Sequence, residues 1–576
     1  MKFRAASASV LGREAMRELD ARTINAGTAS IDLMEWAGEA IADALADVSL
    51  HGVPLPETPR LLVLAGPGNN GGDGFVVARL LAAQGWLCTV ALAGAEPEEG
   101  SDAAANLDQW RDEGGTVIDA AEAIGLLQQG AADFDLGLDA IFGTGLARPV
   151  SGADADFIQH LNKSGLPIVA ADIPSGLCSD TGCPLGIAVR ARATVTIGAA
   201  KPGLFLDQGP NYGGRVRVAD IGLLEPAAAG IARSGVVIDR TTTAGSWPRL
   251  VPLTHKGSRG HVLIVAGSRG KTGAAVLTAR GALRAGAGLV TVACVGEVQA
   301  AVAAALPEAM TQLLASDAGG ELSPDAMKDL AVLAESATSI VVGPGLGTGP
   351  GADAAVALLL GLKKPLVLDA DALNIVSAWD DQRRHDLFRA RTAAGAPAPV
   401  LTPHPGEMGR LVNATNFKVQ LSRVLFTYNL AKELGAVVVL KGAATIVADG
   451  RGPAGAPPVS HAAGASGAPA ASPAPVPAEG GEAPPFEAGA GDGGPRATLA
   501  FNLSGNPGMA CAGMGDVLSG ICGAMPVRLT DPFESACLAV YAHAVAGDVL
   551  VRGGTGFLAS ELADALPAVL ATRHPR

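Results

Sequence analysis

The stretch AGPGNNGGDG, residues 65–74, directly follows the apolar run Leu61–Leu64 and places five glycines, two asparagines and one aspartate in ten positions. Glycine loses more conformational freedom on folding than any other residue, so this density of glycine indicates a backbone that must approach something closely. An apolar run, a glycine-rich turn and a second apolar run are typical of a strand–loop–helix unit in an α/β sheet. We therefore expect a strand over Leu61–Ala65 and a helix over Phe75–Ala83.

The same alternation continues along most of the chain. At 576 residues the chain is too long for one core, and its length predicts roughly two to four domains. Strand-like runs separated by Ala/Leu-rich helical runs predict parallel sheets covered on both faces. The predicted strands after the first are Leu87–Leu92, Leu138–Phe142, Pro167–Ala171, Ala193–Ile197, Arg215–Ala219, His261–Ala266, Leu289–Val295, Ser339–Val342, Pro365–Leu368, Pro399–Leu401 and Val437–Leu440.

Two stretches interrupt the pattern. The alternation lapses near residues 222–250, so we predict a first domain over 1–224, a linker over 225–250 and a second domain over 251–576. Residues 450–496 are nearly all Ala, Gly, Pro and Ser, which cannot bury enough apolar surface to order the chain. We expect this segment to be a disordered insert at a loop tip, because the flanking runs TIVAD and TLAFNL would otherwise form a hairpin. Ahead of the first motif, helices are expected over Arg13–Leu19 and Ile31–Leu45, with Ser30 as an N-cap.

The amino-acid composition of the chain argues against several kinds of binding partner. The net charge of −14 and pI of about 5.2 argue against a nucleic-acid or anionic-membrane surface. No uncharged apolar run approaches the ~18–20 residues that span a bilayer, and the N-terminus lacks the apolar core of a secretory signal. The seven cysteines form no CxxC pair, which favours reduced thiols in a cytoplasmic protein and disfavours a zinc site.

Three polar clusters in the first half each follow a predicted strand: GPGNNGGDG (66–74), DAIFGTGLARP (139–149) and DIPSGLCSDTG (172–182). Ligands of open α/β sheets bind outside the carboxyl ends of the strands, and amides at a helix N-terminus can face an anion. Each cluster alone could be an ordinary strand-to-helix turn with a capping aspartate. Three such clusters at one sheet edge favour a ligand site.

The side chains of these clusters suggest two kinds of chemistry. Asn70, Asp139 and Ser175 offer hard oxygen ligands without sulfur or imidazole, a set that suits an alkali or alkaline-earth cation. Asp172 precedes Pro174 and Gly176 in a tight turn at a strand end, where a carboxylate can act as a general acid or base.

These motifs, preceded by LMEWAG (33–38), resemble the NAD(P)H-hydrate epimerase family over about residues 10–222. That family has a Rossmann-like α/β fold and interconverts the R and S forms of hydrated NADH and NADPH. The resemblance implies that Asn70, Asp139 and Ser175 hold a potassium ion and that Asp172 contacts the nicotinamide end and moves protons. It also implies that the substrate's phosphates and ribose are bound by Asn69, Asn70, Gly71, Gly72, Asp73, Gly143, Thr144, Gly145, Leu146, Ala147, Arg148 and Pro149.

Four clusters in the second half follow the same logic: GPGLG (343–347), TPHPGEMGRL (402–411), LKGAATIVAD (440–449) and NPGMACAGMGDVLSG (506–520). In the last, glycines precede a helix expected from Val517, so Asp516 is either a proton-transferring carboxylate beside an anion site or merely an N-cap. Lys441 is either a nucleotide contact or a solvated strand end. His404 is as readily structural as functional.

Together these clusters are similar to the ADP- or ATP-dependent NAD(P)H-hydrate dehydratases, which have a ribokinase-like α/β fold, over about residues 250–449 and 497–570. The likeness implies that Asp516 is catalytic in a nucleotide-driven loss of the C6 hydroxyl of the S-hydrate. Fusion to an epimerase resembles the bacterial enzymes, which consume ADP with magnesium. By the same likeness the adenine nucleotide is bound by Lys441, Gly442, Ala443, Ala444, Thr445 and Gly515, and the hydrated cofactor by Ala274, Gly345, His404 and Asp516.

The sequence therefore predicts a bifunctional repair enzyme, and we expect a homo-oligomer because such domains often self-associate. One alternative is a ribokinase-like kinase of a vitamin precursor fused to a dinucleotide sensor. The GxGD turn fits that kinase equally well, whereas TPHPGE and NPGMA do not. A second alternative, a non-catalytic dinucleotide-binding module, is disfavoured by Asp172 and Asp516.

Overall fold

The computed structural model describes residues 9–129, 131, 133–226, 228–231, 234–240, 243, 255–451, 499–527, 529–551 and 556–571. These residues divide into two compact units, the first ending at Val236 and the second beginning at Val237. The division falls inside the predicted linker, where β9 (Gly235–Ile238) pairs with β1 (Ser9–Val10) in antiparallel fashion. The predicted disordered insert lies outside the described residues, except for Gly450 and Arg451.

The first unit is built on a parallel sheet. Among the described residues its strand order is β4-β3-β2-β5-β6-β7-β8, and all neighbouring strands are parallel. The chain runs from β2 outward to β4, then returns beside β2 and runs outward the other way, so the strand order reverses between β2 and β5. The strands are β2 (Arg60–Ala65), β3 (Leu87–Leu92), β4 (Thr116–Ile118), β5 (Leu136–Ala140), β6 (Ile168–Ala171), β7 (Ala193–Ile197) and β8 (Arg215–Ala219).

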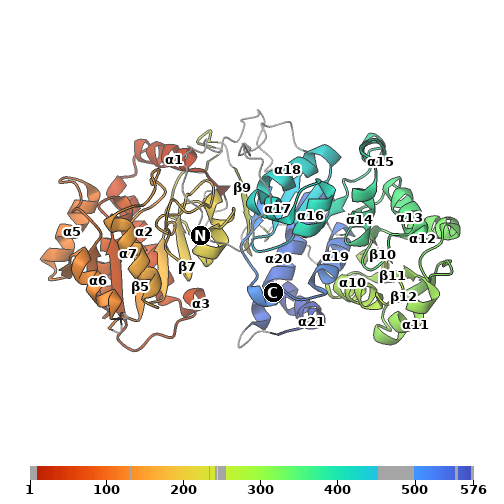
Figure 1. Cartoon of the computed structure of the whole chain (residues 1–576), viewed down its shortest axis with the longest axis horizontal. Coiled ribbons are helices and arrows are strands. Elements are labelled where there is room, and N and C mark those ends of the chain that lie inside the picture. Colours follow the sequence, from red (N-terminus) through yellow and green to blue (C-terminus); the bar gives the residue numbers. More distant parts are fainter. Residues whose placement is uncertain are drawn as a thin grey trace, which may run out of the picture. The chain divides into compact units, whose positions relative to one another are not determined.

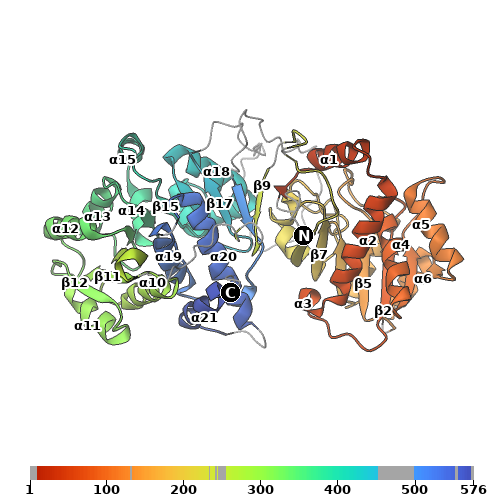
Figure 2. The same cartoon turned by 180° about the vertical axis from the view of Figure 1, so that it is seen from behind.

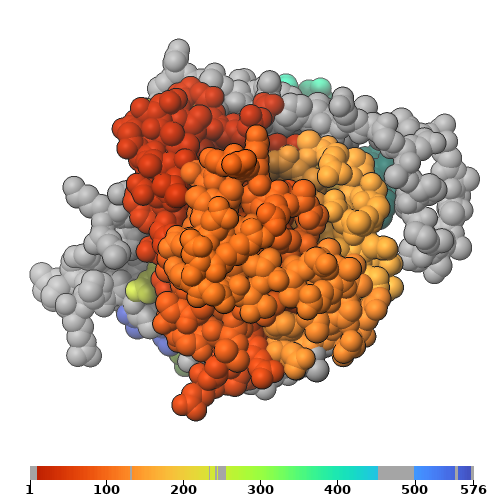
Figure 3. Space-filling view, turned by 90° about the vertical axis from the view of Figure 1, so that its left-hand side faces the viewer, coloured from red at the N-terminus to blue at the C-terminus, as the bar shows by residue number. Residues whose placement is uncertain are grey.

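Helices cover both faces of this sheet, which Figures 1 and 2 show from opposite sides. Alternate residues of β2 point to opposite faces. Leu61 and Val63 pack with α1, α2, α4 and α5, whereas Leu62 and Leu64 pack with α6 and α7. Figure 3 shows the outer surface of this unit, with the α1–α2 segment in red beside the orange segment that contains α5 and α6. The helices are α1 (Arg13–Asn25), α2 (Ser30–Ala46), α3 (Val48–His51), α4 (Asn69–Ala83), α5 (Asp102–Asp112), α6 (Ala120–Gln128), α7 (Ala153–Lys163), η1 (Pro202–Leu204) and α8 (Gly209–Gly213).

The second unit has a larger sheet with a similar reversal. Its strand order in the described chain is β18-β17-β16-β15-β14-β13-β10-β11-β12. The strands from β16 to β12 are parallel, while β17 and β18 are antiparallel, as expected for the runs TIVAD and TLAFNL. The order reverses between β10 and β13. The strands are β10 (His261–Val265), β11 (Leu289–Cys294), β12 (Met310–Leu313), β13 (Ser339–Val342), β14 (Leu366–Leu368), β15 (Val400–Leu401), β16 (Val437–Leu440), β17 (Ile446–Asp449) and β18 (Leu499–Asn502).

Helices surround this second sheet as well (Figure 1). A Cβ on Gly520 of α19 would overlap the Thr278 carbonyl of α10, so these two helices cross at backbone contact. The helices are η2 (Gly257–Arg259), α10 (Thr272–Arg284), α11 (Gly296–Ala305), η3 (Pro324–Ala326), α12 (Met327–Ser336), α13 (Pro350–Leu360), α14 (Asp371–Ala378), α15 (Asp381–Ala393), α16 (Pro405–Leu411), α17 (Asn416–Leu421), α18 (Arg423–Leu434), η4 (Pro507–Met509), α19 (Met514–Ala524), η5 (Met525–Val527), α20 (Pro532–Leu550) and α21 (Ala559–Ala571).

Of the described helices, α20 alone has the length and mean hydropathy, 1.2, of a membrane span. It carries Glu534 and Asp548, and 67% of its most apolar window is buried inside the protein. Its polar His543 is also buried and contacts the Met514 carbonyl at 3.0 Å. The helix is therefore a core element of the second unit.

Two helix starts differ from the prediction. Helix α2 begins at Ser30 itself, and Ala29 occupies the N-cap without a side-chain hydrogen bond. Helix α4 begins at Asn69 instead of Phe75, so most of the glycine-rich motif is its first turns. The glycines are required by packing: a Cβ on Gly71 would overlap the Gly66 carbonyl, and one on Gly72 would lie 2.5 Å from the Met34 sulfur.

We predict that Gly71→Ala lowers the free energy of unfolding by about 1–3 kcal/mol, because the added methyl has no room. Urea-induced unfolding of the full chain, followed by tryptophan fluorescence, measures the change. Gly125→Ala is the matched control, since Gly125 lies inside α6 with nothing within 4 Å of its Cβ position. That substitution should be neutral or stabilise by up to ~1 kcal/mol. Equal effects of both substitutions would contradict the packing role.

Candidate active sites

In the first unit the three predicted motifs follow β2, β5 and β6, at the edge where the strand order reverses. The loops after β2 and β5 are in direct contact: the Gly66 amide donates to the Ala140 carbonyl at 3.0 Å, and a Cβ on Gly66 would overlap the Ile141 carbonyl. Such a reversal point is where open α/β sheets bind ligands. The topology thus brings the motifs to one place.

The oxygen ligands predicted from the sequence lie at this edge. Asp139 is fully buried at the end of β5, and its carboxylate accepts the Ser175 amide at 2.8 Å and the Ser175 hydroxyl at 2.5 Å. Burial raises the pKa of Asp139 to about 6, against the lowering effect of these hydrogen bonds. The Ser175 hydroxyl in turn accepts the Phe142 amide at 2.8 Å.

Asn70, in the first turn of α4, is unsatisfied. Its side chain is buried, Gly143 would place a Cβ 3.5 Å from its Oδ1, and neither Oδ1 nor Nδ2 has a hydrogen-bond partner. A buried amide oxygen without a donor loses its hydration without compensation. This orphan oxygen lies at the same sheet edge as the Asp139 carboxylate and the Ser175 hydroxyl, and hard oxygens of this kind suit a monovalent cation.

Asp172 has a buried partner that the sequence analysis missed. Its backbone lies in the left-handed region (φ +63°), and its carboxylate forms an ion pair with Lys201, which is 1% exposed. Lys201 also donates to the Ile197 carbonyl at 2.6 Å. It is the fourth residue after the end of β7, so it belongs to another segment that leaves the carboxyl end of a strand.

Two further carboxylates face this ion pair. Burial raises the pKa of Asp73 well above its ordinary value, and the charge of Asp172 raises it further. Burial likewise raises the pKa of Asp20 to about 6, with Lys201 opposing the shift. Asp20, in α1, was not predicted. The charges of Lys201 and Asp172 thus influence the pKa values of both Asp20 and Asp73.

The segment Gly143–Pro149 forms the outer part of this site. Gly145, Ala147, Arg148 and Pro149 are exposed, and Arg148 lies 3.7 Å from Asp154. A shallow hollow of about 260 Å³ also exists in this unit, lined by residues that include Leu166 and Arg192. Those residues precede β6 and β7, so the hollow lies at the amino ends of the strands, away from the motifs.

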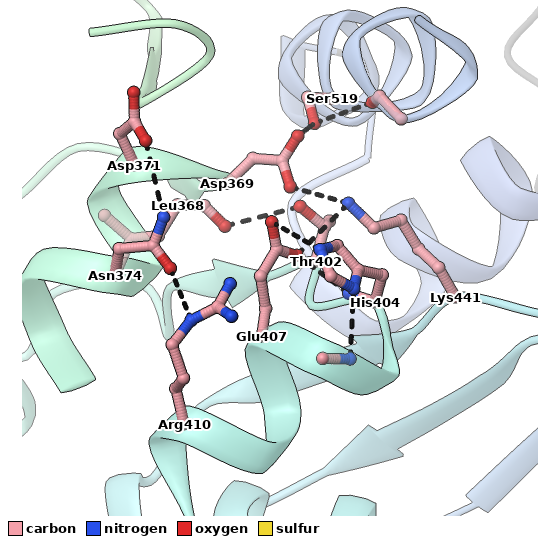
Figure 4. A network of polar contacts seen from close by, with 12 residues as sticks. Leu368, Asp369, Asp371, Asn374, Thr402, His404, Glu407, Arg410, Lys441 and Ser519 are labelled. Atoms are coloured by element: carbon pink, nitrogen blue, oxygen red, sulfur yellow. Dashed lines mark hydrogen bonds and ion pairs between the residues drawn. The ribbon is translucent and has the colours of Figure 1, made fainter. Parts of the chain in front are cut away.

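The second unit centres on Lys441 at the end of β16 (Figure 4). Its ammonium lies 2.8 Å from Asp369 and 3.7 Å from Glu407, and its side chain is only 18% exposed. Burial lowers the pKa of Lys441, but the two carboxylates outweigh burial and the pKa is raised. Lys441 is therefore no solvated strand end. Asp369, which also accepts the Ser519 hydroxyl at 2.6 Å, was not singled out in the sequence, although it follows β14 directly.

Asp516 lies inside the first turn of α19, which begins at Met514 instead of at the predicted Val517. The N-cap is Gly513, and no side chain caps the helix, so Asp516 is not an N-cap. Burial raises the pKa of Asp516 to about 6, Asp369 raises it further and Lys441 opposes the shift. A carboxyl that titrates near neutral pH beside a lysine is suited to proton transfer.

His404 caps α16. Its Nδ1 accepts the Gly406 amide at 3.0 Å, while Glu407 accepts the His404 amide at 2.8 Å. His404 Nε2 lies 3.2 Å from Glu407, and the histidine side chain remains 51% exposed. Hydrogen bonding to His404 and the charge of Lys441 overcome burial and lower the pKa of Glu407. His404 thus has a structural role and still presents an open ring edge.

The remaining predicted residues lie in a loop after β13 and in the first turns of α10 and α19. Gly345 follows β13 with φ +62°, and its Cβ position is 3.2 Å from Ala274 at the start of α10. These two residues flank the reversal point between β10 and β13. A Cβ on Gly515 would lie 3.1 Å from the Lys441 ammonium. In the described parts of the chain, no group of three His, Cys, Asp or Glu residues has the arrangement of a metal site.

Comparisons with known proteins identify the family. Residues 30–203 match the family described as YjeF-related protein N-terminus, and residues 262–468 and 494–568 match NAD(P)H-hydrate dehydratase. The chain is 35% identical to the bifunctional NAD(P)H-hydrate repair enzyme Nnr of Moorella thermoacetica, over 94% of this chain and 92% of that protein. It is 33% identical to the corresponding enzyme of Escherichia coli K12, over 94% and 90%. A Bacillus subtilis ADP/ATP-dependent NAD(P)H-hydrate dehydratase structure, co-crystallized with ATP/Mg²⁺, aligns at 25% identity and a TM-score of 0.44, over 59% of this chain and 98% of that one.

Two sheets, each with charged side chains gathered near the carboxyl ends of its strands, define a two-unit α/β enzyme. The chain belongs to the family of bifunctional NAD(P)H-hydrate repair enzymes. The predicted family, the α/β fold class with a Rossmann-like and a ribokinase-like half, and the predicted repair function are thereby confirmed.

We predict that Asp20→Asn stabilises the protein more at pH 8 than at pH 5. The pKa of Asp20 rises from 3.8 to about 6 on folding, so its contribution to stability is full at low pH and is lost as the pH rises through 6. An asparagine stays neutral, and the gain at about pH 8 should be roughly 1–2 kcal/mol after allowing for partial exposure. Urea midpoints at about pH 5 and pH 8 measure it. Asp43→Asn, at an exposed site in α2, is the control and should show no such difference. A gain for Asp20→Asn that is the same at both pH values would contradict the assignment.

Proposed function

We propose that the first unit epimerises R- and S-NAD(P)H hydrates at the reversal point between β2 and β5. The amides of Asn69–Asp73 and the segment Gly143–Pro149 bind the phosphates and ribose. Asp172 contacts the nicotinamide end and moves the proton, while the ion pair with Lys201 orients its carboxylate. Asn70, Asp139 and Ser175 hold a potassium ion, whose positive charge would stabilise the buried carboxylate and the nearby phosphates.

In the second unit, the proposed reaction is ADP-dependent dehydration of the S-hydrate. Lys441–Thr445 and Gly515 bind the adenine nucleotide, which enters with magnesium. Ala274, Gly345 and His404 contact the hydrated cofactor. Asp516 exchanges a proton with the hydroxyl that is lost from C6. Its carboxyl is suited to this proton transfer because its pKa is raised to about 6 and it lies beside Lys441.

One observation carries this proposal: each unit buries a lysine against an acid at the carboxyl edge of its sheet, next to a glycine-rich turn. Buried ion pairs are expensive unless both charges are fully paired, so their presence at both ligand-binding edges favours a catalytic use. The fusion has a chemical reason, because the R form is not a substrate for dehydration and must first be epimerised.

The proposal also covers the cellular compartment, the binding partners and the self-association of the enzyme. All seven cysteines are free, in line with a cytoplasmic protein. The acidic net charge of −14 supports small-molecule partners, with neither nucleic acid nor membrane involved. Self-association into a homo-oligomer is part of the same proposal.

The central test separates the two activities by substitution. Purified protein is given mixed R- and S-NADH hydrate with ADP, magnesium and potassium, and recovery of nicotinamide absorbance is followed. Asp516→Asn should abolish recovery and leave R/S exchange intact, whereas Asp172→Asn should recover only the S fraction, both with rate losses of at least about 100-fold. Loss of both activities in either folded variant would contradict independent sites. A wild-type protein that fails to recover NADH but phosphorylates a pyrimidine alcohol with ATP would be a kinase.

A second test concerns potassium. Asn70→Leu replaces the orphan amide by an apolar side chain of similar size, so the fold should persist while the cation loses a ligand. We expect the potassium concentration for half-maximal epimerisation to rise by at least about tenfold, with dehydration unchanged. Thermal stabilisation by potassium chloride, relative to tetramethylammonium chloride, should also disappear. An unchanged potassium response in this variant would remove Asn70 from the cation site.

A further inference from the structure

The loop Lys441–Thr445, which joins β16 to β17, is held from behind by a buried arginine. Arg423, the first residue of α18, is 6% exposed and has no carboxylate partner among the ion pairs of the described residues. Its guanidinium donates to four backbone carbonyls of this turn instead. These are Ala443, Leu440 at 3.3 Å, Lys441 at 3.4 Å and Ala444 at 3.4 Å.

The other carbonyls of the loop are also satisfied from within the protein. The Gly442 carbonyl accepts the Thr445 hydroxyl at 3.1 Å, and the Thr445 carbonyl accepts the Asn502 amide at 3.0 Å. The backbone therefore directs its acceptors inward along the whole turn.

The backbone amides of the loop differ from its carbonyls in their hydrogen bonding. The Lys441 amide donates to the Pro403 carbonyl at 2.9 Å, but no hydrogen bond found in the described chain is donated by the amides of residues 442–445. Gly442 (φ +142°) and Ala444 (φ +49°) both lie in the left-handed region. Consecutive amides in such turns form concave sites for anions.

The electrostatics of Arg423 explain why this arrangement persists. Burial lowers the pKa of Arg423 to about 10, because its charge is removed from water without an opposing carboxylate. Carbonyl dipoles compensate part of that penalty. The uncompensated positive charge lies directly behind the free amides, where it would attract a phosphate on their other side.

We propose that Arg423 is a positioning residue for the nucleotide: it draws the carbonyls of residues 440–444 inward and so presents the amides of residues 442–445 to a phosphate of ADP. The inference rests on the proposed nucleotide-binding role of this loop. Arg423 touches no nucleotide in this scheme, and its action passes through the backbone.

The test is the substitution Arg423→Lys, which keeps the charge and removes the planar fork that reaches several carbonyls at once. The dissociation constant of ADP, measured by calorimetry, and the KM for ADP should both rise by about tenfold or more, with kcat changing less than about threefold. Arg423→Gly should show a larger loss, and added guanidinium ion at low millimolar concentration should restore part of the affinity. Sodium chloride at the same ionic strength should not.

The chain offers a matched control in Arg391 of α15. This arginine is 2% exposed, and burial lowers its pKa to about 10 as well. It also binds only backbone carbonyls, those of Leu360, Leu362, Lys364 and Pro397. Arg391→Lys should destabilise the fold to a similar extent and change ADP affinity by less than about twofold.

The outcomes distinguish this inference from the proposed function. Arg423→Lys with lowered stability but wild-type ADP affinity would make Arg423 purely structural and overturn the inference. Equal affinity losses for Arg423→Lys and Arg391→Lys would overturn it as well. If wild-type protein binds ADP but does not dehydrate the hydrate, the proposed function fails while calorimetry still tests Arg423. If it binds no ADP, both fail.

Discussion

Both halves of this enzyme depend on one topological constraint. Crossover connections between parallel strands are right-handed. When the chain adds strands first on one side of a starting strand and then on the other, the connecting helices therefore pack on opposite faces of the sheet. The loops that leave the two central strands then diverge at their carboxyl ends. This happens between β2 and β5 in the first unit and between β10 and β13 in the second. Gly66 contacts Ile141 at the first point, and Gly345 approaches Ala274 at the second.

Each sheet also carries a buried lysine, paired with an acid, near the carboxyl ends of its strands. Lys201 is almost fully enclosed with Asp172, and its pairing keeps that aspartate in an uncommon backbone conformation that would otherwise be strained. The Lys441 side chain is more exposed than that of Lys201, and its ammonium lies between Asp369 and Glu407. The charge of Lys441 also opposes the rise in the pKa of Asp516 that burial causes. In both units the lysine holds a carboxylate in an ion pair, so the charged side chains of each site are positioned by the protein itself.

The two sites differ in the polar groups that they offer. The first has the buried Asp139–Ser175 pair and, at the same sheet edge, the unsatisfied amide of Asn70. The second offers a row of backbone amides whose carbonyls are drawn away by Arg423. A cation fits the former and an anion fits the latter. Glycine has a separate task in the first site, where it lets α4 begin against the backbone of the preceding loop.

Much of this could be predicted from the sequence because its signals are local. Five predicted strands match the structure residue for residue, among them Leu87–Leu92, Ala193–Ile197 and Val437–Leu440. Apolar runs of this kind fold as strands wherever both faces are covered. The strand predicted over Leu138–Phe142 is shifted by two residues, because the pattern does not reveal where the last ladder hydrogen bond forms. The short strands β4 and β12 were missed, since three or four residues with exposed positions carry little periodicity.

The motifs at strand ends could also be predicted from the sequence, because the residues of each motif are consecutive in the chain. The family and the repair function followed from these motifs. Lys201, Asp369 and Arg423 were not singled out, although each lies near a predicted motif. Their importance arises only from partners that are distant in the sequence. Lys201 contacts Asp172, 29 residues away, Asp369 contacts Lys441, 72 residues away, and Arg423 contacts Ala443, 20 residues away. A sequence can specify which side chain follows a strand, but which distant charge it will meet is decided when the sheet closes and water is excluded from between them.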